Sequence, residues 1–449
     1  MAIKAGAILH DINGFVIDRI QSGGPGNLNI PEEKIYELGN WNSVATVRDI
    51  PDLSFDLESF DVTCELECIL TNEDPTTFPH SDDGGFTEGD NEIDFANHIP
   101  IDVISPFKSR RNQYNIVKGL AVPYLTLERA SYRFGLRQNA AQSFTFRGDS
   151  IFYIPGQPYY EEFDYTSVGT SGAKATLDVE AILYSEGSTA SIYALCVVLI
   201  NSVTRAYKRL YFDPLGTSGY SNSSTQVWVN DQGEFPQGTA EGEYDLMRVV
   251  YGSTTADAIS DGSNDYDPDT DGLGTNPTGN EVHEGVSVKP AAVRPKDIDV
   301  FIYPGATPTP VRLTSVQSAE VNWSVTLEQD EEFGNSHYVG MDYDTPDVAG
   351  SIGVKPYDPA DLWAKLAQIT GVDVAEVIGP DTSVPLPMEI RIYHPDDNSI
   401  RLKTLYVPDA RFQVPGLQGR VQTKLETTLN FTSDQGILKV YNGVRDIDE

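Results

Sequence analysis

Residues 120–154, LAVPYLTLERASYRFGLRQNAAQSFTFRGDSIFYI, decide the fold because apolar and polar side chains alternate along them. The apolar members of this alternation are Leu125, Leu127, Tyr132, Phe134, Leu136, Phe144 and Phe146. A period of two residues predicts β-strands that bury one face. We therefore expect a mainly β protein.

A second stretch, LYVPDARFQVPGLQGRVQTKLETTLNFTSDQGILKV, repeats this pattern 285 positions further along, so that Val122-Pro123 falls on Val407-Pro408. Without a gap, Leu127 falls on Phe412, Tyr132 on Leu417, Leu136 on Val421, Phe144 on Leu429, Phe146 on Phe431 and Asp149 on Asp434. We interpret the two stretches as an internal duplication of one β-rich domain. The alternative, that any two alternating hairpins look alike, stays open.

Segments upstream of each stretch extend the match. Leu53, Phe55 and Leu57 share one face of a predicted strand, as do Val321, Trp323 and Val325 in the second copy. Each half also contains one helical candidate, ending in PIDVISP at 100–106 and in GVDVAEVIGP at 371–380. The second candidate is the clearer one, with Asp358 as N-cap, Pro359 in the first turn and the apolar stripe Leu362, Trp363, Leu366 and Ile369.

Length and composition suit two copies of a domain with additional material. The chain has 449 residues with 39% hydrophobic content, and its 38 Gly and 28 Pro predict many turns between short strands. We assign 1–165 to an N-terminal arm and the first domain, and 166–212 to a connection and the first strands of the second. Residues 213–295 form an acidic, loop-rich insertion, and 296–449 complete the second domain.

A formal net charge of −36 argues against affinity for a phosphate backbone, because nucleic-acid binders present Lys and Arg. The N-terminus lacks a secretory signal, and no apolar run reaches transmembrane length. Cys64, Cys68 and Cys196 cannot form a disulfide framework and suit a reducing cytoplasm. Cys64 and Cys68 lie four apart on a predicted strand, where we expect buried structural thiols.

The insertion holds one weak metal-binding pattern. Asp267, Asp269 and Asp271 precede Gly272 with the spacing that begins a calcium loop. The twelfth position of that loop is Thr278 rather than Glu, and no flanking helices are evident. A solvated acidic loop is the favoured interpretation, and we expect neither a metal nor another cofactor.

Common catalytic motifs are missing from the sequence. It contains no H-E-x-x-H, P-loop, G-x-G-x-x-G or G-x-S-x-G, and its six histidines are scattered singly. Paired carboxylates that could hydrolyse a glycosidic bond occur, but 67 acidic residues produce most spacings by chance. We do not expect an enzyme.

Three segments, at 16–59, 114–156 and 407–443, resemble the tail tube proteins of long-tailed bacteriophages. The resemblance covers most of both halves and omits the insertion. It implies a β-barrel or sandwich domain with a flanking short helix, and a structural role in the virion tail after assembly in the host cytoplasm. Such domains close side by side into rings, which stack through loops and N-terminal arms.

The resemblance also implies the partners. Because the domain occurs twice, a ring of three chains with pseudo-six-fold symmetry is favoured, although a hexamer is possible. The chain would contact itself in stacked rings, the baseplate and tail terminator proteins, and a sheath if the tail is contractile. Double-stranded DNA would pass through the tube without specific binding.

We expect carboxylates and small polar groups to line the lumen, where they repel phosphates. The candidates, on the polar face of the duplicated strands, are Asp56, Glu58, Glu65, Glu67, Thr326, Glu328, Glu426 and Thr428. Arg133, Arg137 and Arg147 cannot all face such a lumen, so we expect them at subunit interfaces. A baseplate hub or tail-tip protein with the same fold, and a carbohydrate-binding module or hydrolase, are the alternatives.

Overall fold

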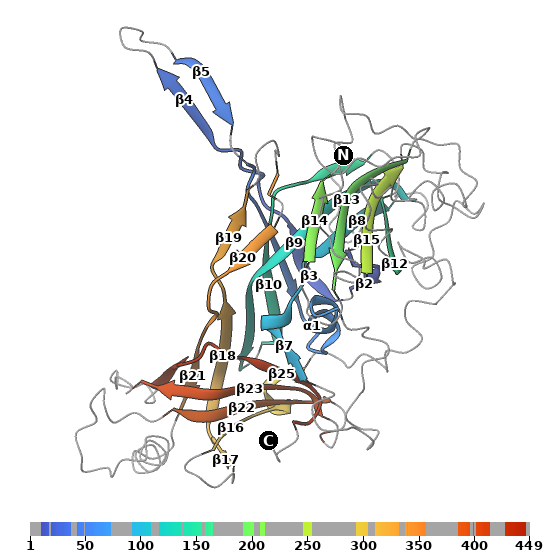
Figure 1. The fold of residues 1–449 in the computed structure, drawn as a ribbon. Coiled ribbons are helices and arrows are strands. Elements are labelled where there is room, and N and C mark those ends of the chain that lie inside the picture. Colours follow the sequence, from blue (N-terminus) through green and yellow to red (C-terminus); the bar gives the residue numbers. More distant parts are fainter. Residues whose placement is uncertain are drawn as a thin grey trace.

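The computed structural model describes residues 10–17, 19–36, 43–48, 50–72, 92–108, 116–136, 138–154, 158–164, 192–201, 207–211, 246–253, 293–303, 310–331, 337–338, 340–355, 385–395, 398, 401–413 and 427–445. The predicted second helix at 358–369, the calcium pattern, Arg137 and Glu426 lie outside these residues. Within them the protein is mainly β, as predicted (Figure 1). No described helix has the length and apolar character needed to cross a bilayer.

One antiparallel run of strands forms the body of the molecule, in the spatial order β3-β6-β10-β9-β18-β21-β24-β23. The bounds are β3 Ile20–Pro25, β6 Leu53–Ser59, β10 Ala141–Gly148, β9 Ile116–Gly135, β18 Val316–Ser324, β21 Asp347–Val354, β24 Thr427–Ser433 and β23 Arg401–Phe412. We call this run the main sheet. Strict alternation of burial along β6 and β10 shows why these residues form strands with one buried face.

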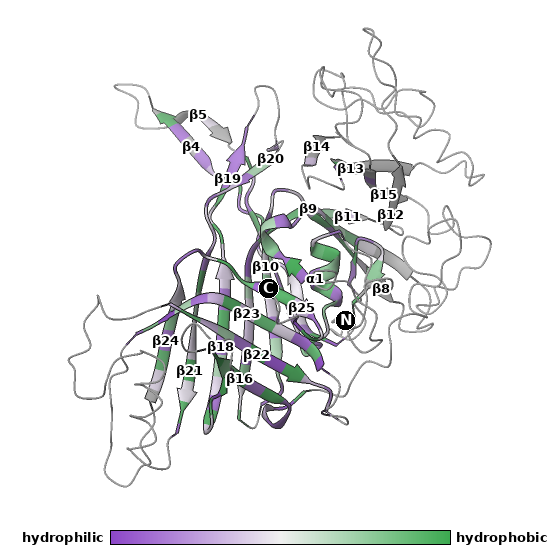
Figure 2. Cartoon of the chain, turned by 60° about the horizontal axis from the view of Figure 1, so that its bottom comes forward, coloured by the Kyte–Doolittle hydropathy of each residue, from purple (hydrophilic) through white to green (hydrophobic). Residues whose placement is uncertain are grey.

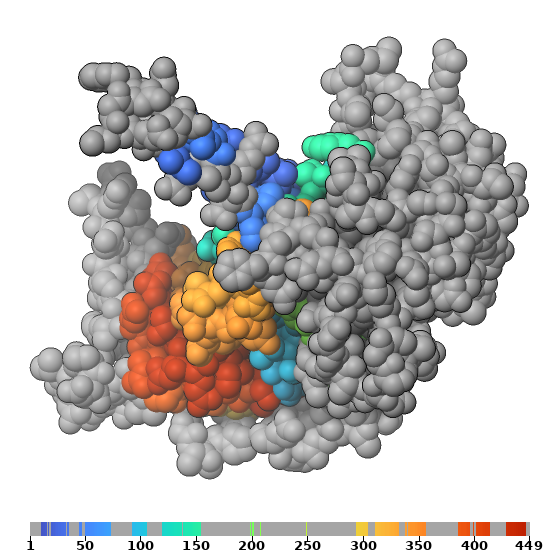
Figure 3. Space-filling view, turned by 45° about the horizontal axis from the view of Figure 1, so that its top comes forward, coloured from blue at the N-terminus to red at the C-terminus, as the bar shows by residue number. Residues whose placement is uncertain are grey.

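Further strands extend from β9 and β23 and close the core from the other side. One set consists of β1 Asp11–Ile12, β2 Phe15–Val16, β8 Ile101–Lys108 and β11 Phe152–Ile154. Together with β3, β6, β9 and β10 of the main sheet, it makes up what we call the first half. In the second half the further strands are β16 Ile298–Ile302, β17 Val311–Arg312, β22 Leu386–Tyr393 and β25 Lys439–Asn442, which join β18, β21, β23 and β24. The short β7, Glu92–Asp94, pairs with β25, and Figure 3 shows these two regions side by side.

The two halves share their pairing register. In the first, Ile101 pairs with Leu125 and Val103 with Val122, with a bulge between the pairs. In the second, Leu386 pairs with Ala410 and Met388 with Val407, again with a bulge between them. Each residue of the second set lies 285 positions after its counterpart in the first. The shift found in the sequence thus relates the strand pairs β8–β9 and β22–β23 without adjustment.

A second irregularity recurs at β3 and β18. Both strands bulge before their second pair, at Ile20/Ser22 and at Val316/Ser318. The bulged residues are Gln21 and Gln317, and each side-chain amide donates to the carbonyl two residues earlier, at 3.1 and 3.3 Å. Those earlier residues, Arg19 and Ser315, both have a positive φ of 57° and 65°.

The register corrects one predicted match. Phe55 pairs with Phe146 on β10, and Phe431 on β24, which lies 285 positions after Phe146, pairs with Gly350 on β21. The counterpart of β6 is therefore β21, and the counterpart of β3 is β18. The prediction that residues 53–57 correspond to 321–325 is wrong, because alternating apolar residues identify a strand but not its place in a sheet.

The first helical candidate is also wrong. Residues 101–108 form β8, whereas the α-helix of the first half, α1, spans Glu65–Leu70 and follows β6 directly. Short 3-10 helices occupy Phe95–Asn97 and Pro295–Asp297. Cys64 is therefore the N-cap of a helix and Cys68 lies within that helix rather than on a strand, although both side chains are buried as predicted and form no disulfide. Burial raises the pKa of Cys64.

Three smaller sheets complete the described structure. The largest is four-stranded, in the order β12-β15-β13-β14, with bounds β12 Pro158–Asp164, β15 Leu246–Ser253, β13 Ile192–Ile200 and β14 Tyr207–Tyr211. Its contacts with the main body are to β8 and β9. We assigned 166–212 to a connection and the first strands of the second copy; the described strands in that range, β13 and β14, pair with each other and β13 with β15 in this small sheet.

The other two are hairpins. β19 Leu327–Asp330 pairs with β20 Gly340–Tyr343 beyond the end of β18, and β4 Glu32–Tyr36 pairs with β5 Ser43–Arg48. Figure 1 shows the β4–β5 hairpin projecting away from the body.

Candidate functional site: the polar face of the main sheet

One face of the main sheet is buried and the other is polar. Side chains that point away from the core align across both halves because the strands pair without interruption through the β9–β18 joint. One transverse row of paired residues contains Gly24, Asp56, Thr145, Arg129, Ser324 and Asp347. A second contains Ala141, Arg133, Glu320, Ser351 and Asn430. We call this surface the polar face; the alternation of hydrophilic and hydrophobic residues that creates it is visible along β18 and β21 in Figure 2.

Several predicted lumen residues lie on the polar face. Asp56 is exposed and accepts a hydrogen bond from the Thr145 hydroxyl at 2.8 Å. Glu58 accepts one from the Ser22 hydroxyl at 3.1 Å. Thr428 is exposed on β24 and is paired with Gly353. The structure therefore brings Asp56, Glu58 and Thr428 onto one surface.

Thr326 and Glu328 are exposed but lie outside the main sheet. Thr326 falls between β18 and β19, and Glu328 is on β19, which pairs only with β20. Both residues follow β18 in the chain, but neither is paired with a strand of the main sheet. Whether they face a channel stays a prediction.

Glu65 and Glu67 are not on a strand face. Both lie on α1, and Glu67 has 0% exposed surface, so it cannot face a channel. Its carboxylate is paired with the ammonium group of Lys403 on β23 and accepts a hydrogen bond from the Tyr132 hydroxyl at 2.8 Å. Lys403 also donates to Gln142 at 2.9 Å. These contacts join α1 of the first half to β23 of the second, so a charge that we assigned to a lumen instead links the halves.

Arg133 and Arg147, which we predicted at subunit interfaces, lie on the polar face with the acids and are paired within the chain. Arg133 lies 3.6 Å from Glu320 and so bridges the β9–β18 joint. Arg147 is paired with Asp52 at 3.3 Å and with Glu128 at 2.9 Å. Partners within the chain allow the arginines to occupy an otherwise acidic face. A role at subunit interfaces stays a prediction.

One Ser-His-Asp group occurs beside β10. Ser150 lies 3.1 Å and Asp149 3.0 Å from His337, but both approach the same ring nitrogen, Nδ1. A catalytic triad needs the hydroxyl at one ring nitrogen and the carboxylate at the other. The geometry of this group is therefore that of a hydrogen-bonded core residue. No group of three or more potential metal ligands occurs in the described part of the chain.

Sequence reasoning missed Glu320 and Asn322 on β18 and Arg129 on β9. The signal was available, because Glu320 and Asn322 alternate with Val321 and Trp323, whose burial was predicted and is confirmed. Reading the polar half of that alternation would have found the first two. Their alignment with Arg133 and Ser131 depends on the register between halves, which no local pattern specifies.

Comparisons with known proteins give a weak structural similarity. No family model and no curated protein matches the chain. Among solved structures, a chain of the six-fold symmetrised baseplate of the anti-feeding prophage is similar over 35% of this chain and 98% of its own, with a TM-score of 0.22 and 11% identity. A TM-score of this size carries no argument about function, which we take from the polar face and the strand register.

Proposed function

We propose that this chain is a structural, non-enzymatic protein of a long-tailed bacteriophage that forms the inner tail tube. The observation that carries the proposal is the uninterrupted polar face, which passes from one half to the other across the β9–β18 joint. Two halves with the same strand register behave as two copies of one building unit. A sheet that is apolar on one side and polar on the other suits the wall of a water-filled conduit.

The joint between the halves supports closure into a ring. β9 and β18 pair over seven residues inside the chain, from Ser318–Gly135 to Ser324–Arg129. β3 holds the same place in the first half as β18 in the second, yet among the described strands it pairs only with β6. An unpaired edge of this kind accepts another strand. A neighbouring copy that repeats the β9–β18 joint at β3 would close three chains into a ring with pseudo-six-fold symmetry.

The charges of the polar face suit a channel that does not retain DNA. The carboxylates of Asp56 and Glu58 are hydrogen-bonded to hydroxyl groups, whereas Arg133 and Arg147 are already paired with carboxylates. A paired guanidinium attracts a phosphate less than a free one. The resulting surface would let the genome pass during ejection.

The β4–β5 hairpin supports stacking of rings. It projects from the body, and among the described elements its strands make extensive contacts with each other alone (Figure 1). An isolated two-stranded hairpin is marginally stable in water, so this arm gains stability against another surface. In the tail that surface would be the next ring. Baseplate, terminator and, in a contractile tail, sheath proteins would complete the contacts in the virion.

The test is electron microscopy of the purified chain together with its mass in solution. Hollow tubes or stacked rings with three chains per ring are expected. A single ring that never stacks would assign the chain to a baseplate hub instead. A monomer that persists at high concentration would contradict the proposal.

The role of the polar face is tested with virions that carry altered tubes. Asp56→Lys with Glu58→Lys should leave assembly intact and slow DNA release, because the new cations attract phosphates. Asp56→Asn with Glu58→Gln is the matched control that removes charge without reversing it, and it should give an intermediate release rate. If both double variants release DNA at the rate of the parent, the polar face does not line the lumen.

A further inference from the structure

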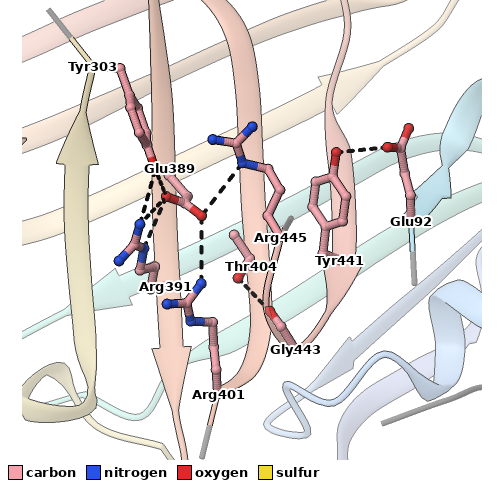
Figure 4. Close-up of polar contacts among 9 residues, drawn as sticks. All are labelled: Glu92, Tyr303, Glu389, Arg391, Arg401, Thr404, Tyr441, Gly443 and Arg445. Atoms are coloured by element: carbon pink, nitrogen blue, oxygen red, sulfur yellow. Dashed lines mark hydrogen bonds and ion pairs between the residues drawn. The ribbon is translucent and has the colours of Figure 1, made fainter. Parts of the chain in front are cut away.

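An arginine cluster lies on the outer face of the second half, on the side of β22 and β23 that faces away from the core. Arg391, Arg401 and Arg445 surround the carboxylate of Glu389 (Figure 4). β22 supplies Glu389 and Arg391, β23 supplies Arg401, and Arg445 follows β25. The cluster is distinct from the polar face and from the Glu67–Lys403 pair.

Arg391 makes the closest contacts in the cluster. Its Nε and Nη2 donate to Oε2 of Glu389 at 3.0 and 2.6 Å. The Tyr303 hydroxyl donates to the same oxygen and accepts from Arg391 at 3.0 Å. Oε2 is therefore saturated by one guanidinium and one hydroxyl.

Arg401 and Arg445 are held more loosely. Nη1 of Arg401 and Nε of Arg445 both lie 3.8 Å from Oε1 of Glu389, which is beyond a hydrogen bond. The Nε atoms of both arginines are buried and make no hydrogen bond. One carboxylate thus serves three guanidinium groups and satisfies only one of them.

The cluster has a surplus of positive charge at low exposure. The side chains of Arg391, Arg401 and Arg445 are 12%, 13% and 7% exposed. Burial, followed by the charge of Arg391, lowers the pKa of Arg401, whereas, despite burial, hydrogen bonds to Glu389 and Tyr303 raise the pKa values of Arg391 and Arg445 respectively. Among the described residues of this face, the other charged groups have partners of their own, since Arg312 is paired with Asp299, Lys439 with Glu92, and Asp94 caps a 3-10 helix.

Aromatic rings hold the guanidinium groups in place. Arg391 stacks on Phe301 and Arg445 on Tyr406, each with 3.9 Å from the guanidinium carbon to the ring centroid. Stacking covers the faces of the guanidinium planes and leaves their N–H edges for hydrogen bonds. Guanidinium groups that are held in place in this way are suited to binding carboxylates.

The corresponding face of the first half is covered by the chain itself. There the four-stranded sheet lies against β8 and β9, with Val198 and Ile200 in a core with Tyr124. Arg248 of that sheet donates a hydrogen bond to the carbonyl of Pro100. None of the described strands covers β22 and β23 in this way. The same face of the same unit is thus buried in one half and open in the other.

We propose that the arginine cluster is a docking surface for an acidic segment of a second copy of this chain. The inference rests on the proposed function, because a tail tube brings copies of this chain into contact. Charge complementarity selects the partner, because a chain with 67 acidic residues and a net charge of −36 offers many carboxylates and opposes its own association elsewhere. The guanidinium groups of the cluster would supply a local attraction that offsets this repulsion between two copies.

The experiment measures self-association of the full chain by sedimentation over a concentration series. Arg391→Gln with Arg401→Gln should weaken association on the order of tenfold or more at low salt, and raising salt to about 0.5 M should weaken the parent chain similarly. Arg391→Lys with Arg401→Lys keeps the charge and loses the forks, so an intermediate loss is expected. Arg312→Gln, on the same face but paired with Asp299, is the matched control and should associate like the parent. Circular dichroism confirms that each variant is folded.

The outcomes separate this inference from the tube proposal. If the folded glutamine variant assembles like the parent into tubes, the docking surface is wrong and the tube stands. If the parent forms only salt-sensitive dimers that the variant loses, the docking surface stands and the tube is wrong. Capture of an acidic tail or sheath protein by the cluster, with self-association unchanged, would overturn the choice of a second copy as partner.

Discussion

The two halves of the molecule share a backbone plan and differ in what they enclose. β8–β9 and β22–β23 have the same register and the same bulge, and β3 and β18 repeat a bulge with the same glutamine contact. Their side chains, in contrast, have diverged. The comparison teaches that strand pairing and bulges specify the backbone of each half. The side chains of the core and of the outer face can change without altering that backbone.

Three differences between corresponding positions illustrate the divergence. His10, just before β1, corresponds to Val300 of β16. This follows from the register, because Ile12 pairs with Val103, Ile302 pairs with Met388, and Val103 and Met388 are corresponding residues. Phe55 in the first half corresponds to Gly350 in the second. The outer face is covered by a small sheet in one half and carries the arginine cluster in the other.

The largest expected effect comes from breaking the link between the halves. Lys403→Met leaves Glu67 buried and unpaired, which should cost about 3–5 kcal/mol of unfolding free energy. Glu67→Leu with Lys403→Met removes both charges and should recover most of that loss. Urea unfolding monitored by tyrosine and tryptophan fluorescence measures both. A single variant as stable as the parent would show that the pair does not link the halves.

Acid should weaken the first half through His10. Burial lowers the pKa of His10 to about 4, from 6.5 in the unfolded chain, so the neutral form is favoured in the fold. Its contribution is fully present above pH 6.5 and is lost as pH falls from 6.5 to 4, by about 3 kcal/mol in total.

His10→Val installs the residue found in the second half and should flatten this part of the pH profile. Unfolding free energies of both chains between about pH 4 and 7 test the comparison. Parallel profiles would mean that another group causes the acid sensitivity.

Gly350→Ala tests the close packing that distinguishes the second half. A Cβ atom at this position would overlap the Phe431 ring and the carbonyl oxygen of Glu320. We expect a loss of about 1–3 kcal/mol, because the backbone of β18 cannot move aside without breaking its pairing. Adding Phe431→Leu relieves only the clash with the ring and should restore part of the loss, as thermal unfolding would show. Parental stability of the Gly350→Ala variant would contradict the close approach.

The smallest effect should come from the shared bulges. Gln21→Ala removes one amide contact to a backbone carbonyl and Gln317→Ala removes two, each variant at a cost of about 0.5–1.5 kcal/mol. Gln317 is half-buried and Gln21 is exposed, so the loss at Gln317 should be the larger. Denaturant titrations of the two single variants decide this order. The reverse order would show that the two bulges are held by different contacts.

The sequence by itself determined the strands and much of their pairing. Alternation predicted the buried faces of β6, β9 and β10, and the shift of 285 positions proved to be the shift that relates the two registers. These properties are local, because side-chain direction alternates with period two and bulges lie at particular residues. Asp56, Glu58 and Thr428 were found for the same reason.

Only the tertiary structure decided where the other charges lie. Cys64, Leu66, Cys68 and Leu70 alternate like a strand, yet this segment contains a helix in which Glu67 is buried against Lys403, a residue 336 positions away. The arginine cluster is likewise built from β22, β23 and the segment after β25, which supplies Arg445. A local pattern shows which side chains share a face, but the partner of a buried charge depends on which distant strand the fold places beside it.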